Sequence, residues 1–84
     1  MKNEHVKFKD KQKEKIKLYD DVKLKKDVFY QDSEGEYTFK KGSIGTVIEI
    51  EKTKDCMVEI DINDSKSQMT FGQPYIPIED LELI

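Results

Sequence analysis

The residues of this chain that could do chemistry are one histidine, one cysteine and many carboxylates. His5 lies near the start of the sequence, and Cys56 has neither a second cysteine nor a histidine near it, so an activated Cys–His nucleophile is not expected. Zinc needs sets of Cys and His that the chain lacks. Asp61, Asn63 and Asp64 offer oxygen ligands without the spacing or the closing Glu of a calcium loop. The sequence therefore predicts no enzyme, no cofactor and no metal site.

Carboxylates do recur in a regular pattern, at alternate positions of two apolar segments, residues 44–51 and 56–62. Such alternation is typical of half-buried strands, so we expect a β-hairpin with its carboxylates on the solvent face. Those carboxylates are Glu49, Glu51, Glu59 and Asp61, with Asp55 and Asp64 in the adjoining loops. Like charges opposite one another destabilise a sheet. A cluster of them that lowers stability is a candidate surface for a basic partner.

The register of this hairpin follows from its apolar residues, because a slip of one residue reverses every side chain. We expect Ile48 and Ile50 to face the core together with the apolar residues of the second strand. Two registers satisfy this condition: Ile50 opposite Cys56 across a three-residue loop, or Ile50 opposite Val58 across a five-residue loop.

Charge is divided unevenly along the 84 residues, a length that corresponds to one domain with a thin core. Residues 1–26 carry a net charge of +5 and residues 27–84 a net charge of −8. Lysine fills every odd position from 7 to 17 with no apolar stripe beside it. We therefore expect residues 1–15 to form a basic, partly disordered leader and residues 16–84 to form the folded domain.

Residue types and segments that the sequence lacks limit the class of partner and the cellular compartment. All 15 basic residues are lysine, and lysine does not supply the bidentate contacts by which arginine reads guanine and phosphate. Sequence-specific reading of nucleic acid is therefore disfavoured. A single cysteine allows no internal disulfide, and neither a signal peptide nor a membrane-spanning stretch is present, so we expect a cytoplasmic protein.

Turn residues divide the remainder into short strands. Gly42 and Gly45 mark a bend before the central hairpin. The other expected elements are a strand at 22–24, its extension or a second strand at 28–30, a turn at 31–36, a turn at 63–67, a strand at 68–71, a 3₁₀ turn within 77–81 and an edge strand at 81–84. About five short strands without a helical period predict an all-β fold, a small, partly open barrel.

Six aromatic residues are expected to pack in the core or at its rim: Tyr19, Tyr30, Tyr37, Phe39, Phe71 and Tyr75. Three of them, Tyr30, Tyr37 and Tyr75, flank loops, and contact with a partner is the less favoured alternative for these.

From Leu18 to the last residue the chain resembles the SH3-like and KOW-type small barrels. The resemblance lies in four motifs: Asp21-Val22-x-Leu24, Lys41-Gly42-x-x-Gly45-Thr46-Val47, Val58-x-Ile60, and the closing Pro77-Ile78-Glu79-Asp80-Leu81-Glu82-Leu83. It is also similar to short stand-alone bacterial proteins with the outline LYDxVxL, KGxxGTVxE and DLEL. Some of those are immunity proteins encoded beside toxin genes.

We consider three functions, of which the resemblances imply the first two. The first is a cytoplasmic immunity protein that binds and neutralises a cognate toxin, a nuclease in particular, through the acidic face. The second is a KOW-like module that binds RNA or the ribosome with the lysines of residues 7–17, which the acidic domain disfavours. The third is an accessory subunit that pairs with an enzyme complex through an edge strand.

Overall fold

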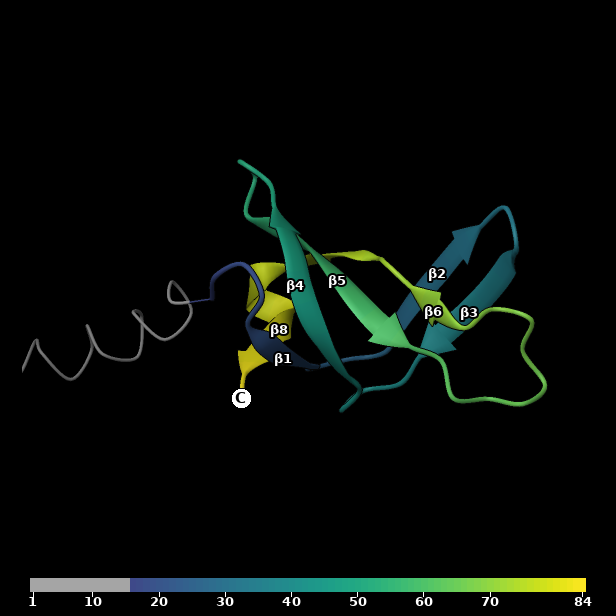
Figure 1. Ribbon diagram of the computed structural model, residues 1–84. Helices are drawn as coiled ribbons and strands as arrows, with labels where there is room; N and C mark the ends of the chain where they lie inside the picture. The colour runs from purple at the N-terminus through teal and green to yellow at the C-terminus, as the bar shows by residue number, and fades with distance from the viewer. Residues whose placement is uncertain (1–15) are drawn as a thin grey trace, which may run out of the picture.

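The computed structural model describes residues 16–84, and the expected basic leader lies outside them. Eight strands and one 3₁₀ turn make up the described chain (Figure 1). They are β1 (Asp21–Leu24), β2 (Val28–Asp32), β3 (Gly35–Phe39), β4 (Ile44–Ile50), β5 (Asp55–Asp61), β6 (Phe71–Gly72), β7 (Tyr75–Pro77), η1 (Ile78–Asp80) and β8 (Leu81–Leu83). Residues 16–84 contain no α-helix, and the predicted all-β class is confirmed.

The strands form two open antiparallel sheets. The larger sheet has the order β6-β5-β4-β1-β8, and β7 also pairs with β5. The hairpin β2–β3 forms the smaller sheet. Figure 1 shows β4 and β5 crossing the middle of the molecule, with β2–β3 toward one side and β1 and β8 toward the other. Because β8 pairs with β1, the end of the described chain is fastened to its beginning.

The core is small and mostly aliphatic. Its buried side chains are Ile16, Val22, Leu24, Phe39, Val47, Cys56, Val58, Ile60, Ile62, Met69, Ile76 and Leu81. Phe39 contacts two partly buried tyrosines, with ring centroids 6.3 Å from Tyr30 and 5.1 Å from Tyr37. All three residues belong to the smaller sheet, which joins the core through the buried side chain of Phe39.

The loop end of the β4–β5 hairpin has the first of the two predicted registers. Ile50 lies opposite Cys56. The Glu51 N–H donates to the Asp55 carbonyl at 2.8 Å, and the Lys54 N–H donates to the Glu51 carbonyl at 2.9 Å. The loop therefore spans three residues, and its last residue, Lys54, has a positive φ of 69°, as three-residue hairpin loops require.

A β-bulge changes the faces of β4 from those predicted. Between Val47 and Glu49 the register shifts, and Ile48 is the extra residue. Val47 is fully buried, whereas Ile48 is only half-buried and Ile50 is 38% exposed. The prediction that Ile48 faces the core is wrong, because strict alternation does not continue through a bulge and Val47 is buried in its place. Ile50 lies on the core side as predicted, opposite the buried Cys56, but its position next to the loop leaves it partly exposed.

Elsewhere the expected elements are largely present. The 3₁₀ turn and the closing edge strand are confirmed as η1 and β8, and the strand at residues 28–30 is a separate one, β2. The strand expected at 68–71 is wrong: β6 covers only Phe71–Gly72. In the preceding residues the Ser67 Oγ accepts a hydrogen bond from the Met69 N–H at 3.1 Å, which holds a turn instead of a ladder.

The two glycines of the predicted bend have different roles. Gly42 has a φ of +93°, which favours glycine. Gly45 lies where β4 and β5 approach closely: a Cβ there would lie 2.6 Å from the Glu59 carbonyl oxygen and 2.7 Å from side-chain carbons of Ile60 and Val58. Any larger residue at Gly45 must push the two central strands apart.

We predict that Gly45→Ala lowers the free energy of unfolding by about 1–3 kcal/mol, the usual cost of overpacking a core. Urea unfolding followed by circular dichroism measures it. Thr38→Ala, at an exposed position of β3, is the control and should change stability by less than ~0.5 kcal/mol. An unchanged urea midpoint for Gly45→Ala would show that β4 and β5 are not so close.

Candidate functional site

Strand β5 alternates between the core and the surface. Its even-numbered residues are buried, and its odd-numbered residues, Asp55, Met57, Glu59 and Asp61, lie on the opposite side. Glu49 of β4 lies opposite Met57 and so joins the same side, and Glu51 follows it two residues along. We call this surface the acidic sheet face; its carboxylates are Glu49, Glu51, Asp55, Glu59 and Asp61. It contains all of the predicted site residues except Asp64.

Negative charge is concentrated at the hairpin end of the acidic sheet face. The pKa of the Glu51 carboxyl is raised above its ordinary value, chiefly by a side-chain hydrogen bond with Glu49. Partial desolvation and the charges of Glu49 and Asp55 raise the pKa further. These three carboxylates therefore interact with one another, and a cation placed among them would relieve their repulsion.

Two exposed aromatic side chains lie among these carboxylates. Tyr75 lies opposite Met57 and is 50% exposed, and its hydroxyl is 3.5 Å from Glu49 Oε1. Partial desolvation, followed by the charges of Glu49 and Glu51, raises the pKa of Tyr75. Phe71 lies opposite Asp61 and is 45% exposed. The sequence interpretation favoured the core or its rim for both rings and did not predict that they lie on the acidic sheet face. Their position depends on how β6 and β7 pair with β5.

The face continues onto β4 beyond the bulge. Thr46 lies opposite Glu59, and Ile44, two residues earlier on the same side, is 59% exposed. At the other edge Gln73 Nε2 donates a hydrogen bond to Glu59 Oε2 at 3.3 Å. Exposed aromatic and aliphatic groups among carboxylates make a surface suited to binding another protein.

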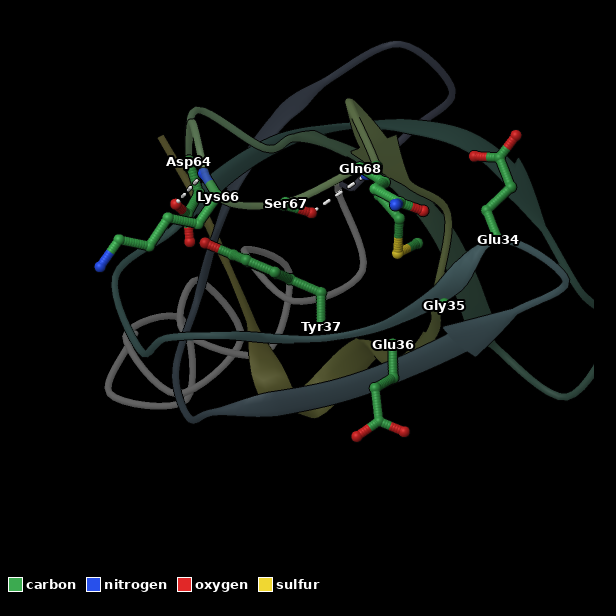
Figure 2. Close-up of a pocket in the computed structure, with 9 residues that line it drawn as sticks. Glu34, Gly35, Glu36, Tyr37, Asp64, Lys66, Ser67 and Gln68 are labelled. Atoms are coloured by element: carbon green, nitrogen blue, oxygen red, sulfur yellow. Dashed lines mark hydrogen bonds between the residues drawn. The ribbon is translucent and has the colours of Figure 1, made fainter.

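Asp64 lies elsewhere, in a groove between the β2–β3 turn and the loop at residues 63–70 (Figure 2). We call it the hairpin groove. It has a volume of about 320 Å³ and is lined by Glu34, Gly35, Glu36, Tyr37, Asp64, Lys66, Ser67, Gln68 and Met69. Figure 2 shows the Tyr37 side chain extending along the groove toward Asp64 and Lys66.

A further groove, of about 390 Å³, has the opposite charge. It is lined by Lys23, Leu24, Lys25, Lys41, Gly42 and Glu82, and we call it the lysine groove. The bend at Gly42 brings Lys41 beside β1, since the Gly42 N–H donates to the Leu24 carbonyl at 2.9 Å. Sequence reasoning placed the basic surface in residues 7–17 and missed this one, which depends on that tertiary contact.

The thiol of Cys56 is fully buried. Burial, and secondarily the charge of Asp55, raises its pKa, so the thiol stays protonated at neutral pH. Cys56 is thus a core residue, as predicted. His5 lies outside the described residues. In the part of the chain that the structure describes, no group of three or more His, Cys, Asp and Glu residues is arranged to hold a metal ion.

No family model, no curated protein and no solved structure matches this chain. Across residues 16–84 there is no helix with the length and apolar character needed to span a membrane.

We predict that Glu51→Gln stabilises the fold at neutral pH. Folding raises the pKa of Glu51, so the protonated carboxyl stabilises the folded protein. This stabilisation is fully present below the unfolded pKa of about 4.3 and is lost as the pH rises through the folded pKa. The charged form therefore destabilises the protein at pH 7. Urea midpoints measured from pH 3 to pH 7 should show a gain for the variant at pH 7 that shrinks toward pH 3.

The matched control is Glu36→Gln, a strand carboxylate whose cross-strand neighbour, Gln31, is uncharged. It should show no comparable gain. A gain for Glu51→Gln that is the same at every pH would contradict the repulsion inferred at this end of the hairpin.

Proposed function

We propose that this chain is a cytoplasmic binding protein of the immunity type, with an SH3-like barrel that docks on a basic toxin domain through the acidic sheet face. The fold assignment is supported by five antiparallel strands in the order β7-β5-β4-β1-β8 and by the 3₁₀ turn before the last of them. It agrees with the motifs by which the sequence resembles SH3-like and KOW-type barrels.

The observation that carries the functional proposal is the mixture of groups on one face. Five carboxylates share the acidic sheet face with the exposed side chains of Ile44, Phe71 and Tyr75. Carboxylates steer a basic partner into position and raise the association rate. Aromatic side chains at the centre of an interface supply most of its binding energy. A nuclease toxin, whose own substrate-binding surface must be basic to hold phosphates, fits this arrangement.

The test is to measure binding of this protein to the product of a toxin gene adjacent to its own gene. Biolayer interferometry gives the association and dissociation rates. We expect Tyr75→Ala to weaken binding by about 10-fold or more, mainly through faster dissociation. The double variant Glu49→Gln with Glu59→Gln should slow association and flatten its dependence on salt.

The matched control removes two carboxylates that are not among the five of the acidic sheet face, as Glu79→Gln with Glu82→Gln on η1 and β8. It should leave the association rate close to that of the unaltered protein. Equal losses in the two double variants, or no binding to any adjacent toxin, would reject the proposal.

A second candidate function rests on the lysine groove. Lys23, Lys25 and Lys41 line one cavity and could contact the phosphates of RNA, together with the lysines at positions 7–17. In this alternative the chain is a KOW-like module that binds RNA or the ribosome.

This alternative predicts RNA binding that weakens steeply with salt. Replacing Lys23, Lys25 and Lys41 with Gln should lower the slope of log K against log salt by up to about 2, since each lost phosphate contact contributes ~0.7 on a single strand. Fluorescence anisotropy with a labelled RNA oligonucleotide measures it. The control replaces Lys52, Lys54 and Lys66 instead. An equal fall in the salt slope for the control would show that the lysine groove has no specific role in RNA binding.

A further inference from the structure

The hairpin groove has two walls that are far apart in the sequence, and hydrogen bonds hold each of them (Figure 2). In the β2–β3 turn, Asp32 Oδ1 accepts a hydrogen bond from the Glu34 N–H at 2.8 Å. Asp32 Oδ2 accepts another from the Tyr30 hydroxyl at 3.0 Å. Tyr30 in turn packs on Phe39 of the core, so this wall is fixed to the rest of the domain.

The opposite wall is the loop at residues 63–70. Asp64 Oδ1 accepts a hydrogen bond from the Lys66 N–H at 2.9 Å, and Ser67 Oγ accepts one from the Met69 N–H at 3.1 Å. The Met69 side chain, only 3% exposed, fastens the loop to the core. Because both walls are ordered before any ligand arrives, binding in the groove costs little conformational entropy.

Tyr37 gives the groove a rigid aromatic side. Its ring packs against Phe39 with a centroid distance of 5.1 Å and an interplanar angle of 63°, an edge-to-face contact. Figure 2 shows the same side chain extending along the groove toward Asp64. An aromatic ring held in place beside a carboxylate is the combination that recognises a guanidinium group, which stacks on the ring and pairs with the carboxylate.

The charges of the groove favour a cation. Glu34 and Asp64 outnumber Lys66, which leaves a net charge of −1 on the side chains at the groove, because Figure 2 shows the Glu36 side chain on the opposite side of its strand from Tyr37. Its volume of about 320 Å³ is at the lower end of ligand pockets, which suits one long side chain better than a broad surface. The groove also adjoins the acidic sheet face, because β5 ends at Asp61 and the chain continues directly to Asp64.

We propose that the hairpin groove receives an arginine side chain of the protein that docks on the acidic sheet face. The identity of that protein rests on the proposed function, whereas the preference of the groove for arginine does not. The proposal assigns Asp64 to the pairing of the guanidinium and Tyr37 to its stacking. Asp64, the one predicted site residue that is not on the acidic sheet face, thereby has a role of its own.

The experiment is an NMR titration of the ¹⁵N-labelled full-length chain with the capped peptide Gly-Arg-Gly. The matched probe is the same peptide with citrulline, which has nearly the shape of arginine without its charge. We expect saturable shifts of the Tyr37, Ser67 and Gln68 amides with the arginine peptide, at millimolar affinity, and much smaller shifts with citrulline. Equal shifts with both peptides, or shifts confined to the acidic sheet face, would overturn the proposal.

Asp64→Asn separates the charge from the structure, because its amide oxygen can still accept the Lys66 N–H. It should lower the affinity for the arginine peptide about threefold to fivefold, as the loss of one exposed ion pair does. Asp61→Asn on the acidic sheet face should leave this affinity unchanged. Tyr37→Leu should weaken the arginine peptide and reduce its selectivity over citrulline, because only the charge of Asp64 then remains to favour arginine, and Tyr37→Phe should retain the selectivity. An arginine affinity unchanged by both Asp64→Asn and Tyr37→Leu would also overturn the proposal.

The outcomes for the groove and for the proposed function can be told apart. If the peptide binds as described and no adjacent toxin binds, the arginine site stands and the immunity function falls. If a toxin binds through the acidic sheet face and the peptide leaves the groove unshifted, the function stands and the arginine site falls.

Discussion

The pairing of β4 with β5 is the constraint on which the rest of the structure depends. β5 pairs with β4, β6 and β7, and β4 connects that group to β1 and, through it, to β8. The two central strands approach so closely at Gly45 that only a glycine leaves room for the Glu59 carbonyl. A small, mostly aliphatic core can hold an open sheet together because its central strands are packed this tightly.

The bulge at Ile48 determines what the outer side of this pair displays. Beyond the bulge, Gly45 and Val47 are buried, and Ile44 and Thr46 lie outside. Without the extra residue these pairs would exchange faces, and the valine rather than the threonine would lie opposite Glu59. Glu49 lies on the loop side of the bulge and faces outward in either case. The bulge therefore adds Ile44 to the apolar part of the acidic sheet face, whereas the pairing of β6 and β7 with β5 supplies Phe71 and Tyr75 and the hairpin register supplies the acidic part.

The same distinction explains what could be predicted from the sequence. Alternation within a strand is local information, and it correctly placed Glu49, Glu51, Glu59 and Asp61 on one side and the β5 residues Val58 and Ile60 in the core. The bulge is a property of how β4 pairs with β5, and alternation alone carries no sign of it. The exposed positions of Phe71 and Tyr75, and the gathering of three lysines around Gly42, likewise depend on which segments meet after folding.

The electrostatics of the acidic sheet face constrain the chemistry of any partner. The raised pKa of Glu51 means that a proton is held more tightly there than on an isolated carboxylate, chiefly because of the side-chain hydrogen bond with Glu49, and also because protonation removes part of the repulsion from Glu49 and Asp55. An ammonium or guanidinium group from a partner would relieve the same repulsion. A proton and a basic side chain are therefore alternative ways to neutralise this group of carboxylates. A neutral or acidic partner would leave the repulsion in place, and burial would strengthen it by lowering the local dielectric constant. The Tyr75 hydroxyl, which donates to Glu49, can remain in such a complex, because a carboxylate has about four lone-pair sites and can accept further hydrogen bonds from an incoming cation.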